Sequence, residues 1–118
     1  MGRVLELQTR ELGSSKVVDI KGEIDGVGLD RFKAGLAEAG DAEGQSVILN
    51  FTDVMFISSS GLGALVAFYK QLRAQNRKLI VYGLRDVIRQ VFEIVRLNKV
   101  MILVDTEEEA LKLLEAEE

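Results

Sequence analysis

Short apolar runs alternate with longer amphipathic segments along this 118-residue chain, and this alternation is what most limits the folds open to it. Val47–Leu49, Leu79–Tyr82 and Met101–Val104 are continuous apolar runs without an intervening polar residue. Runs of this kind are typical of strands that are covered on both faces, as in a parallel sheet. We therefore expect a layered α/β fold.

The start of the chain is expected to form a hairpin. Residues 4–10 and 16–21 have the composition of two strands, and the turn signal Leu12-Gly13-Ser14-Ser15 lies between them. Gly22–Gly28 follows as a loop punctuated by glycines, which leads into the first segment with helical periodicity.

Four segments carry apolar residues at helical spacing. The first ends at Gly40–Gly44, and the last opens at Thr106, whose spacing from Glu109 is that of a capping box. The stripes expected to face the core are Leu29, Phe32 and Leu36; Leu62, Leu65, Val66, Tyr69 and Leu72; Val87, Ile88, Val91, Phe92 and Val95; and Ala110, Leu111 and Leu114.

The element order is strand–strand–helix–strand–helix–strand–helix–strand–helix. It predicts an α/β domain with a mixed, mostly parallel sheet of about five strands, covered by about four helices. No proline, repeat or low-complexity stretch marks a linker, so residues 1–118 are expected to form a single domain. Partners of such sheets favour the carboxyl ends of the strands. Gly22–Gly28 and Ser58–Ser60 both follow strands, so we expect these loops to be neighbours.

The missing residue types exclude several classes of chemistry. The chain has no cysteine, which excludes disulfides, thiol chemistry and thiolate metal sites. It also has no histidine, the usual general base and a common zinc ligand, so Ser-His-Asp and Cys-His systems are excluded. We expect no enzymatic activity, no cofactor and no metal site.

Composition also bears on location and on nucleic-acid binding. No apolar run approaches the ~20 residues of a membrane span. The start, Met1–Glu6, lacks the core of a signal peptide and the hydroxyl residue that favours myristoylation, so a cytoplasmic protein is expected. The net charge of −4 and the lack of interleaved aromatic residues argue against nucleic-acid binding.

Charge is distributed unevenly along the sequence. The stretch from residue 70 to residue 99 is basic, whereas the C-terminal tail is acidic. The basic side chains belong either to solvated helix faces and loop ends or to a surface for an acidic protein partner. They are Lys70, Arg73, Arg77, Lys78, Arg85, Arg89, Arg96 and Lys99, opposed in the same stretch only by Asp86 and Glu93.

Three hydroxyls and a glycine, Ser58-Ser59-Ser60-Gly61, lie where a strand is expected to end and a helix to begin. Free backbone N–H groups and the positive end of the helix dipole meet at such a junction. A serine here can cap the helix, bind a phosphate or receive one. Capping needs only one hydroxyl, and this run supplies three.

Nucleotide-binding motifs are incomplete at this junction. Gly61-Leu62-Gly63 would need a third glycine at Val66 to form a dinucleotide-binding loop, and no Gly-Lys-Ser/Thr sequence exists for a P-loop. Two carboxylates, Glu23 and Asp25, follow the second expected strand. They form either a turn in which Asp25 caps the next helix, or a polar contact site for a kinase or another partner.

Taken together, these residues resemble the STAS domain of bacterial anti-sigma factor antagonists. The similar stretches cover most of the chain, from about residue 4 to residue 114, in the family's order and spacing. They are Gly22-Glu23-Ile24-Asp25, Val47–Phe51, Phe56–Gly63, Leu84–Asn98 and Val104–Leu111.

The resemblance implies a regulator in a partner-switching pathway. Unphosphorylated, such a protein binds an anti-sigma factor that is also a serine kinase; phosphorylation ends the complex and a serine phosphatase restores it. Anchored on Gly61, the family's motif places the phosphoacceptor at Ser59 and its following hydroxyl at Ser60. The family's acidic residue before the acceptor is replaced by Ser58, which is a possible alternate acceptor. Asp25 matches an aspartate of the family's kinase-facing surface.

We expect partner contacts at Asp25, Ser58, Ser60 and Gly61 and on the exposed face of the Gly61–Arg73 helix. Ala64 and Ala67 would let a partner approach that helix closely. Two alternatives remain open: a phosphorylation-independent STAS scaffold or transporter-associated subunit, and a nucleotide-binding or hydrolytic α/β protein. The resemblance implies no particular oligomeric state.

Overall fold

The computed structural model describes residues 4–41 and 44–116. Three segments lie outside the described residues: 1–3, 42–43 and 117–118. They include part of the predicted chain start, Met1–Glu6, and part of Gly40–Gly44, the predicted end of the first helix. The elements are β1 (Glu6–Leu12), β2 (Ser15–Ile24), α1 (Leu29–Gly40), β3 (Val47–Ile57), α2 (Ser59–Ala74), β4 (Leu79–Tyr82), α3 (Asp86–Ile94), the short 3₁₀ helix η1 (Leu97–Lys99), β5 (Ile102–Val104) and α4 (Glu107–Glu115).

The strands form one five-stranded sheet in the order β1-β2-β3-β4-β5. β1 pairs with β2 as an antiparallel hairpin, and every later pair is parallel. The hairpin turns at Gly13, whose φ of +61° suits a residue without a side chain. The predicted mixed, mostly parallel α/β fold is confirmed.

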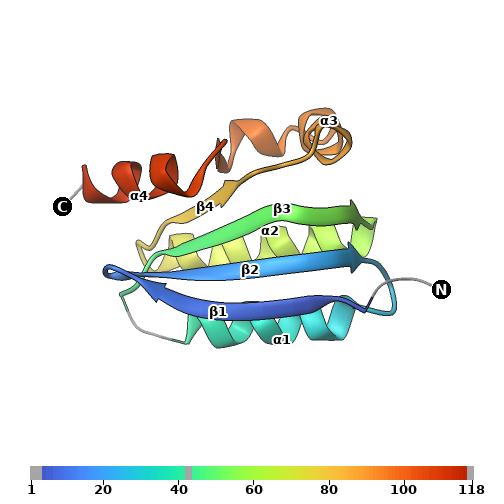
Figure 1. Ribbon diagram of the computed structural model, residues 1–118, viewed down its shortest axis with the longest axis horizontal. Coiled ribbons are helices and arrows are strands. Elements are labelled where there is room, and N and C mark those ends of the chain that lie inside the picture. Colours follow the sequence, from blue (N-terminus) through green and yellow to red (C-terminus); the bar gives the residue numbers. More distant parts are fainter. Residues whose placement is uncertain (1–3, 42–43, 117–118) are drawn as a thin grey trace.

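Helices cover the two faces of the sheet unequally. Figure 1 shows α1 and α2 side by side behind β1, β2 and β3, while α4 lies beside the short β4. The larger core fills the space between the sheet and α1 and α2, and includes Phe32, Phe51 and Leu65. A smaller core on the opposite face joins Ile48 and Ile80 to Ala110 of α4. α4 is too short to cover that face over the full length of β2 and β3.

The two central strands are longer than predicted. β2 continues to Ile24 through part of the expected loop Gly22–Gly28, and β3 continues beyond Asn50 to Ile57. The pairing of the two strands changes register at two irregularities, so the burial along β3 loses the regular alternation of a strand. The second half of β3 was not predicted because its burial is irregular and it contains the polar residues Thr52 and Asp53.

The predicted helix stripes need correction. Leu29 of α1 and Leu111 and Leu114 of α4 are only half-buried. In α2 the buried side includes Phe68, which was not in the predicted stripe, whereas Leu62, Val66 and Tyr69 are only partly buried. In α3 only Ile88 and Phe92 are buried, and the predicted core residues Val87 and Val95 are exposed. α3 lies at the margin of the sheet, where Phe92 packs edge-on against Phe51 of β3, so only one side of it meets the core.

A charged network fixes the start of α4 to the sheet. The Arg10 guanidinium donates hydrogen bonds to Asp19 of β2 (2.6 Å from Nε to Oδ2) and to Glu107 of α4 (3.1 Å from Nη1 to Oε1). Tyr82 donates to Glu107 and Asn50 donates to Asp19, so four strands and one helix meet here. Hydrogen bonds from Arg10 lower the pKa of both carboxyls. Burial and the bond to Glu107 raise the pKa of Tyr82.

Glu107→Gln is expected to lower the free energy of unfolding at pH 7 by about 1 kcal/mol, a value kept small because the pair is partly exposed. A carboxyl whose pKa is lowered by folding stabilises above its unfolded pKa, and this stabilisation is lost as the pH falls. The difference between wild type and variant should therefore shrink between about pH 5 and pH 3. Urea unfolding at several pH values measures it.

Glu108→Gln is the matched control, because Glu108 lies on the same helix and, among the described residues, pairs only with the exposed Lys112. It should change stability by less than about 0.5 kcal/mol. An unchanged pH dependence in Glu107→Gln would contradict the assigned role of the network.

Candidate functional site

The predicted neighbours meet at the carboxyl edge of the sheet. Ile24 at the end of β2 pairs with Ile57 at the end of β3, and the N–H of Ser58 donates to the carbonyl of Ile24 at 2.8 Å. This bond ties the start of α2 to the loop that carries Asp25. The expected proximity of the two loops is confirmed.

Ser58 is the residue that caps α2. Its backbone is extended, and its Oγ accepts a hydrogen bond from the N–H of Gly61 at 3.0 Å. The N–H of Leu62 then donates to the Ser58 carbonyl at 2.9 Å and begins the helix. Ser58 is half-buried, and its hydroxyl is engaged by the helix itself. Serine and aspartate are both favoured at the N-cap of a helix, but a serine caps it without adding a negative charge.

Ser59 and Ser60 occupy the first turn of α2, and both are exposed. Within residues 4–41 and 44–116, neither hydroxyl has a hydrogen-bond partner, and the N–H groups of these two residues also lack one. These N–H groups point out of the amino end of the helix, where the helix dipole is positive.

The amino end of α2 also differs from those of the other helices. Among the described helices, α2 is the only α-helix without an acidic residue in its first turn. α1 begins with Asp30, α3 with Asp86, and α4 with three glutamates. No acidic side chain of its own first turn therefore neutralises the positive end of α2, which favours an anion placed there.

Asp25 lies next to this helix start and closes the turn before α1. Its Oδ1 accepts from the N–H of Gly28 at 2.9 Å, so the carboxylate satisfies one of the free donors ahead of that helix. The side chain is half-buried, and within the described part of the chain its second oxygen forms no hydrogen bond. Asp25 thus shapes the loop and still presents an oxygen to a partner.

Gly61 lies buried where α2 approaches the sheet. A Cβ at this position would lie 2.7 Å from Ile24 Cγ2 and 2.9 Å from Ile57 Cγ1, distances too short for carbon atoms. Only glycine allows α2 to start this close to the ends of β2 and β3. Its contribution to this site is therefore the position of the helix backbone.

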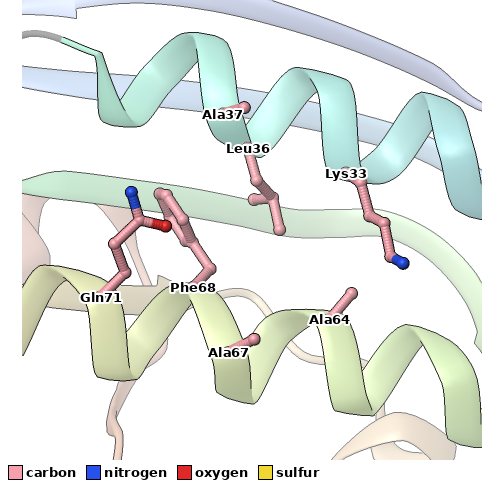
Figure 2. A pocket seen from close by; sticks show the side chains of 7 residues that line it. All are labelled: Lys33, Leu36, Ala37, Ala64, Ala67, Phe68 and Gln71. Atoms are coloured by element: carbon pink, nitrogen blue, oxygen red, sulfur yellow. The ribbon is translucent and has the colours of Figure 1, made fainter.

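Ala64 and Ala67 line a shallow cavity between α1 and α2. Ala64 is partly buried, Ala67 is exposed, and both lie on the same side of α2 as Ser60, at spacings of four and seven residues. The cavity has a volume of about 190 Å³. Figure 2 shows its lining from both helices: Lys33, Leu36, Ala37, Ala64, Ala67, Phe68 and Gln71.

The α1 side of this cavity was not foreseen. Lys33 and Ala37 are exposed residues of an ordinary amphipathic helix, and no motif distinguishes them. They line the cavity because α1 and α2 pack side by side. The small side chain of Ala37, which lines the cavity opposite Ala64 and Ala67, is the one sequence feature that would have suggested a cavity here.

Comparison with known proteins gives the family. The family model described as the STAS domain matches residues 6–110, which include the whole sheet and the serine junction. This chain belongs to the STAS family. A STAS protein of Listeria monocytogenes, the anti-sigma-B factor antagonist, is 31% identical over 90 residues, covering 76% of this chain and 79% of its own length.

Solved STAS structures share the fold. An anti-sigma factor antagonist from Mycobacterium paratuberculosis superimposes with a TM-score of 0.86 at 22% identity, covering 94% of each chain. The Bacillus cell fate determinant SpoIIAA, in its phosphorylated form, superimposes with a TM-score of 0.70 at 26% identity, covering 92% of this chain and 99% of its own. These relatives are regulatory binding proteins that antagonise anti-sigma factors.

No metal or membrane feature adds to the site. Residues 4–41 and 44–116 contain no cluster of three or more acidic side chains placed to hold a metal ion. In the same residues, no helix has the length and apolar character needed to cross a bilayer.

Ser58→Ala is expected to lower the free energy of unfolding by about 1 kcal/mol, because it removes the cap of α2. Ser60 lies two residues further along, and its hydroxyl has no hydrogen-bond partner within residues 4–41 and 44–116. Ser60→Ala should therefore change the free energy of unfolding by less than about 0.5 kcal/mol. Urea unfolding of the two variants measures the difference. Equal stabilities would contradict the assignment of Ser58 as the cap.

Gly61→Ala is expected to destabilise the fold by about 1–3 kcal/mol, because the added methyl group overlaps two isoleucine side chains. Gly63→Ala is the matched control on the same helix, since a Cβ there meets nothing within 4 Å. It should raise stability by about 0.5–1 kcal/mol, as alanine favours the helix over glycine. A similar loss in both variants would contradict the close-approach argument.

Proposed function

We propose that this STAS domain is a cytoplasmic anti-sigma factor antagonist that works by protein–protein contact. It binds an anti-sigma factor that is also a serine kinase while Ser59 is unmodified, and so frees the sigma factor. The kinase phosphorylates Ser59 and the complex separates. A serine phosphatase then returns the protein to its binding form.

The observation that carries the proposal is the exposed Ser59 hydroxyl in the first turn of α2, the helix without an acidic residue at its start. A phosphate there adds a charge of about −1.5 to −2, and the helix dipole stabilises it by about 0.3–1 kcal/mol. The fold tolerates the modification. A partner packed over Ser59 does not, because burying an unpaired dianion costs several kcal/mol.

Ser59 is a better acceptor than Ser58 for a structural reason. The Ser58 hydroxyl is half-buried and already accepts a hydrogen bond from Gly61, so modifying it would disturb the helix cap. The Ser59 hydroxyl is exposed and unengaged within the described residues. The neutral cap at Ser58 also removes a carboxylate that would otherwise lie beside the phosphate.

A phosphorylated relative supports the idea that modification changes the surface and leaves the fold alone. SpoIIAA in its phosphorylated form superimposes on this unmodified chain with a TM-score of 0.70, and the superposition covers 92% of this chain. The docking surface we propose consists of Asp25, Ser60 and the exposed side of α2 with Ala64 and Ala67. Ser58 and Gly61 hold that surface in place from below.

The first test is labelling of the pure protein with radioactive ATP in a lysate of its native host. Wild type and Ser58→Ala should be labelled and Ser59→Ala should not, because Ser59 carries the free hydroxyl. Label on Ser59→Ala but not on Ser58→Ala would move the acceptor. Absence of label on all three, in a lysate that labels a known kinase substrate, would favour a phosphorylation-independent scaffold. Incubation without lysate checks for nucleotide binding by the protein itself.

The second test is the affinity for the kinase purified from that labelling activity. Ser59→Asp should weaken binding by about 100-fold or more, because its charge is buried against the partner. Ser14→Asp is the control, since Ser14 is exposed at the β1–β2 turn at the other end of the sheet. Equal affinity of Ser59→Asp and wild type would contradict the switch.

A further inference from the structure

α3 exposes part of its apolar side. Val87, Val91, Ile94 and Val95 follow one another at helical spacing and form a stripe beside the buried Ile88 and Phe92. Ile94 is 79% exposed, Val87 59% and Val95 48%. The helix therefore buries only part of the apolar surface that its sequence provides.

Several of the exposed apolar residues lie close together in the sequence. Nine large hydrophobic side chains are exposed in the described part of the chain, and four of them lie between residues 87 and 100. The fourth member is Val100, which directly follows η1 and is 49% exposed. Single exposed apolar residues are common on protein surfaces, whereas a contiguous group points to a contact with another molecule.

The tertiary structure shows which basic residues of this region are buried or paired and which are available at the surface. Arg77 is buried and donates to the carbonyls of Gln45 and Gly40, so it belongs to the fold and to no surface. Arg85 donates to the carbonyl of Thr52, and Arg89 pairs with Asp105.

Two cations at the end of α3 remain available. Arg96 and Lys99 are exposed, and within residues 4–41 and 44–116 neither forms an ion pair or a side-chain hydrogen bond. They directly follow the apolar stripe in the sequence. The acidic groups of α3 are Asp86, at the opposite end of the helix, and Glu93.

The backbone of Arg96 is a second, independent observation. Arg96 ends α3 in the left-handed conformation, with φ +62° and ψ +24°. This conformation is unfavourable for a residue with a side chain, and glycine is the usual residue at the position after a helix. An arginine stands at a position that favours glycine, and its side chain has no hydrogen-bond or ion-pair partner among the described residues, which is consistent with a role at the surface.

The two candidate surfaces differ in charge. Glu23 at the end of β2 and Asp25 in the loop after it lie on the Ser59 side, whereas Arg96 and Lys99 follow α3. A segment complementary to one surface would be repelled by the other, so a single uniformly charged segment does not fit both.

We propose that the surface formed by Val87, Ile94, Val95, Arg96, Lys99 and Val100 docks an acidic amphipathic segment of a second partner protein. The apolar side of that segment covers the valines and Ile94, and its carboxylates meet the two cations. Because the surface excludes Ser59, this docking does not depend on the phosphorylation state.

Site-specific photo-crosslinking in a lysate of the native host finds the partner. A photoreactive phenylalanine replaces Val87 in one full-length variant and Leu113 in another. Leu113 is the control because it is 41% exposed on α4, away from α3. A protein crosslinked only through position 87 is identified, its contact segment is mapped, and it is purified for affinity measurements.

The purified partner is then titrated against four variants. Ile94→Gln and Arg96→Gly should each weaken binding by about tenfold or more, as expected for central contact residues. Arg96→Gly should also keep or raise the unfolding midpoint, which separates a binding role from a structural one. Leu113→Gln and Ser59→Asp should bind as wild type does, and added salt should weaken wild-type binding more than that of Arg96→Gly.

Several results would overturn the proposal. They are no protein specific to position 87, a contact segment that is not acidic, or equal affinities for all four variants. Crosslinking to a second copy of the chain would show self-association instead. Capture of the kinase with binding lost in Ser59→Asp would show one continuous interface. Labelling of Ser59 is measured in a separate experiment. A failure of the phosphorylation switch can therefore be told apart from a failure of docking at α3.

Discussion

The parallel pairing of β2 with β3, carried through to Ile24 and Ile57, is the constraint on which the rest of the site depends. The hydrogen bond from the Ser58 N–H to the Ile24 carbonyl extends this pairing by one step beyond the strands. It fixes where α2 begins, and Gly61 then allows the helix to start close to the sheet. A helix start held in this way can carry a modification on its exposed side without any change in the core.

The two faces of the sheet serve different purposes. One face builds most of the core with α1 and α2, and the outer side of α2 remains available to a partner. The other face holds α4 by a small apolar cluster and by the Arg10 network. α3 belongs fully to neither layer, because only Ile88 and Phe92 reach the core. That marginal position is why it presents an apolar stripe to solvent.

Local sequence signals were sufficient for the fold class and for the junction of strand and helix at the three serines. Continuous runs such as Val47–Leu49 indicated buried parallel strands, and the serine–glycine junction indicated a helix start. They did not show how far β3 extends, because its second half is irregular in burial. Nor did they separate Arg77, which is buried, from the exposed cations near it, since arginines look alike in sequence.

The sequence by itself determined the order of the elements, the lack of thiol and imidazole chemistry, and the presence of three hydroxyls at one junction. These follow from periodicity and residue type, which are local properties. Only the tertiary structure decided that Ser58 caps the helix while Ser59 stays free, and that one side of α3 is uncovered. The cap itself is a local contact between Ser58 and Gly61, but the bond from the Ser58 N–H to Ile24 fixes its place at the edge of the sheet. The uncovered side of α3 depends on packing between residues far apart in the chain.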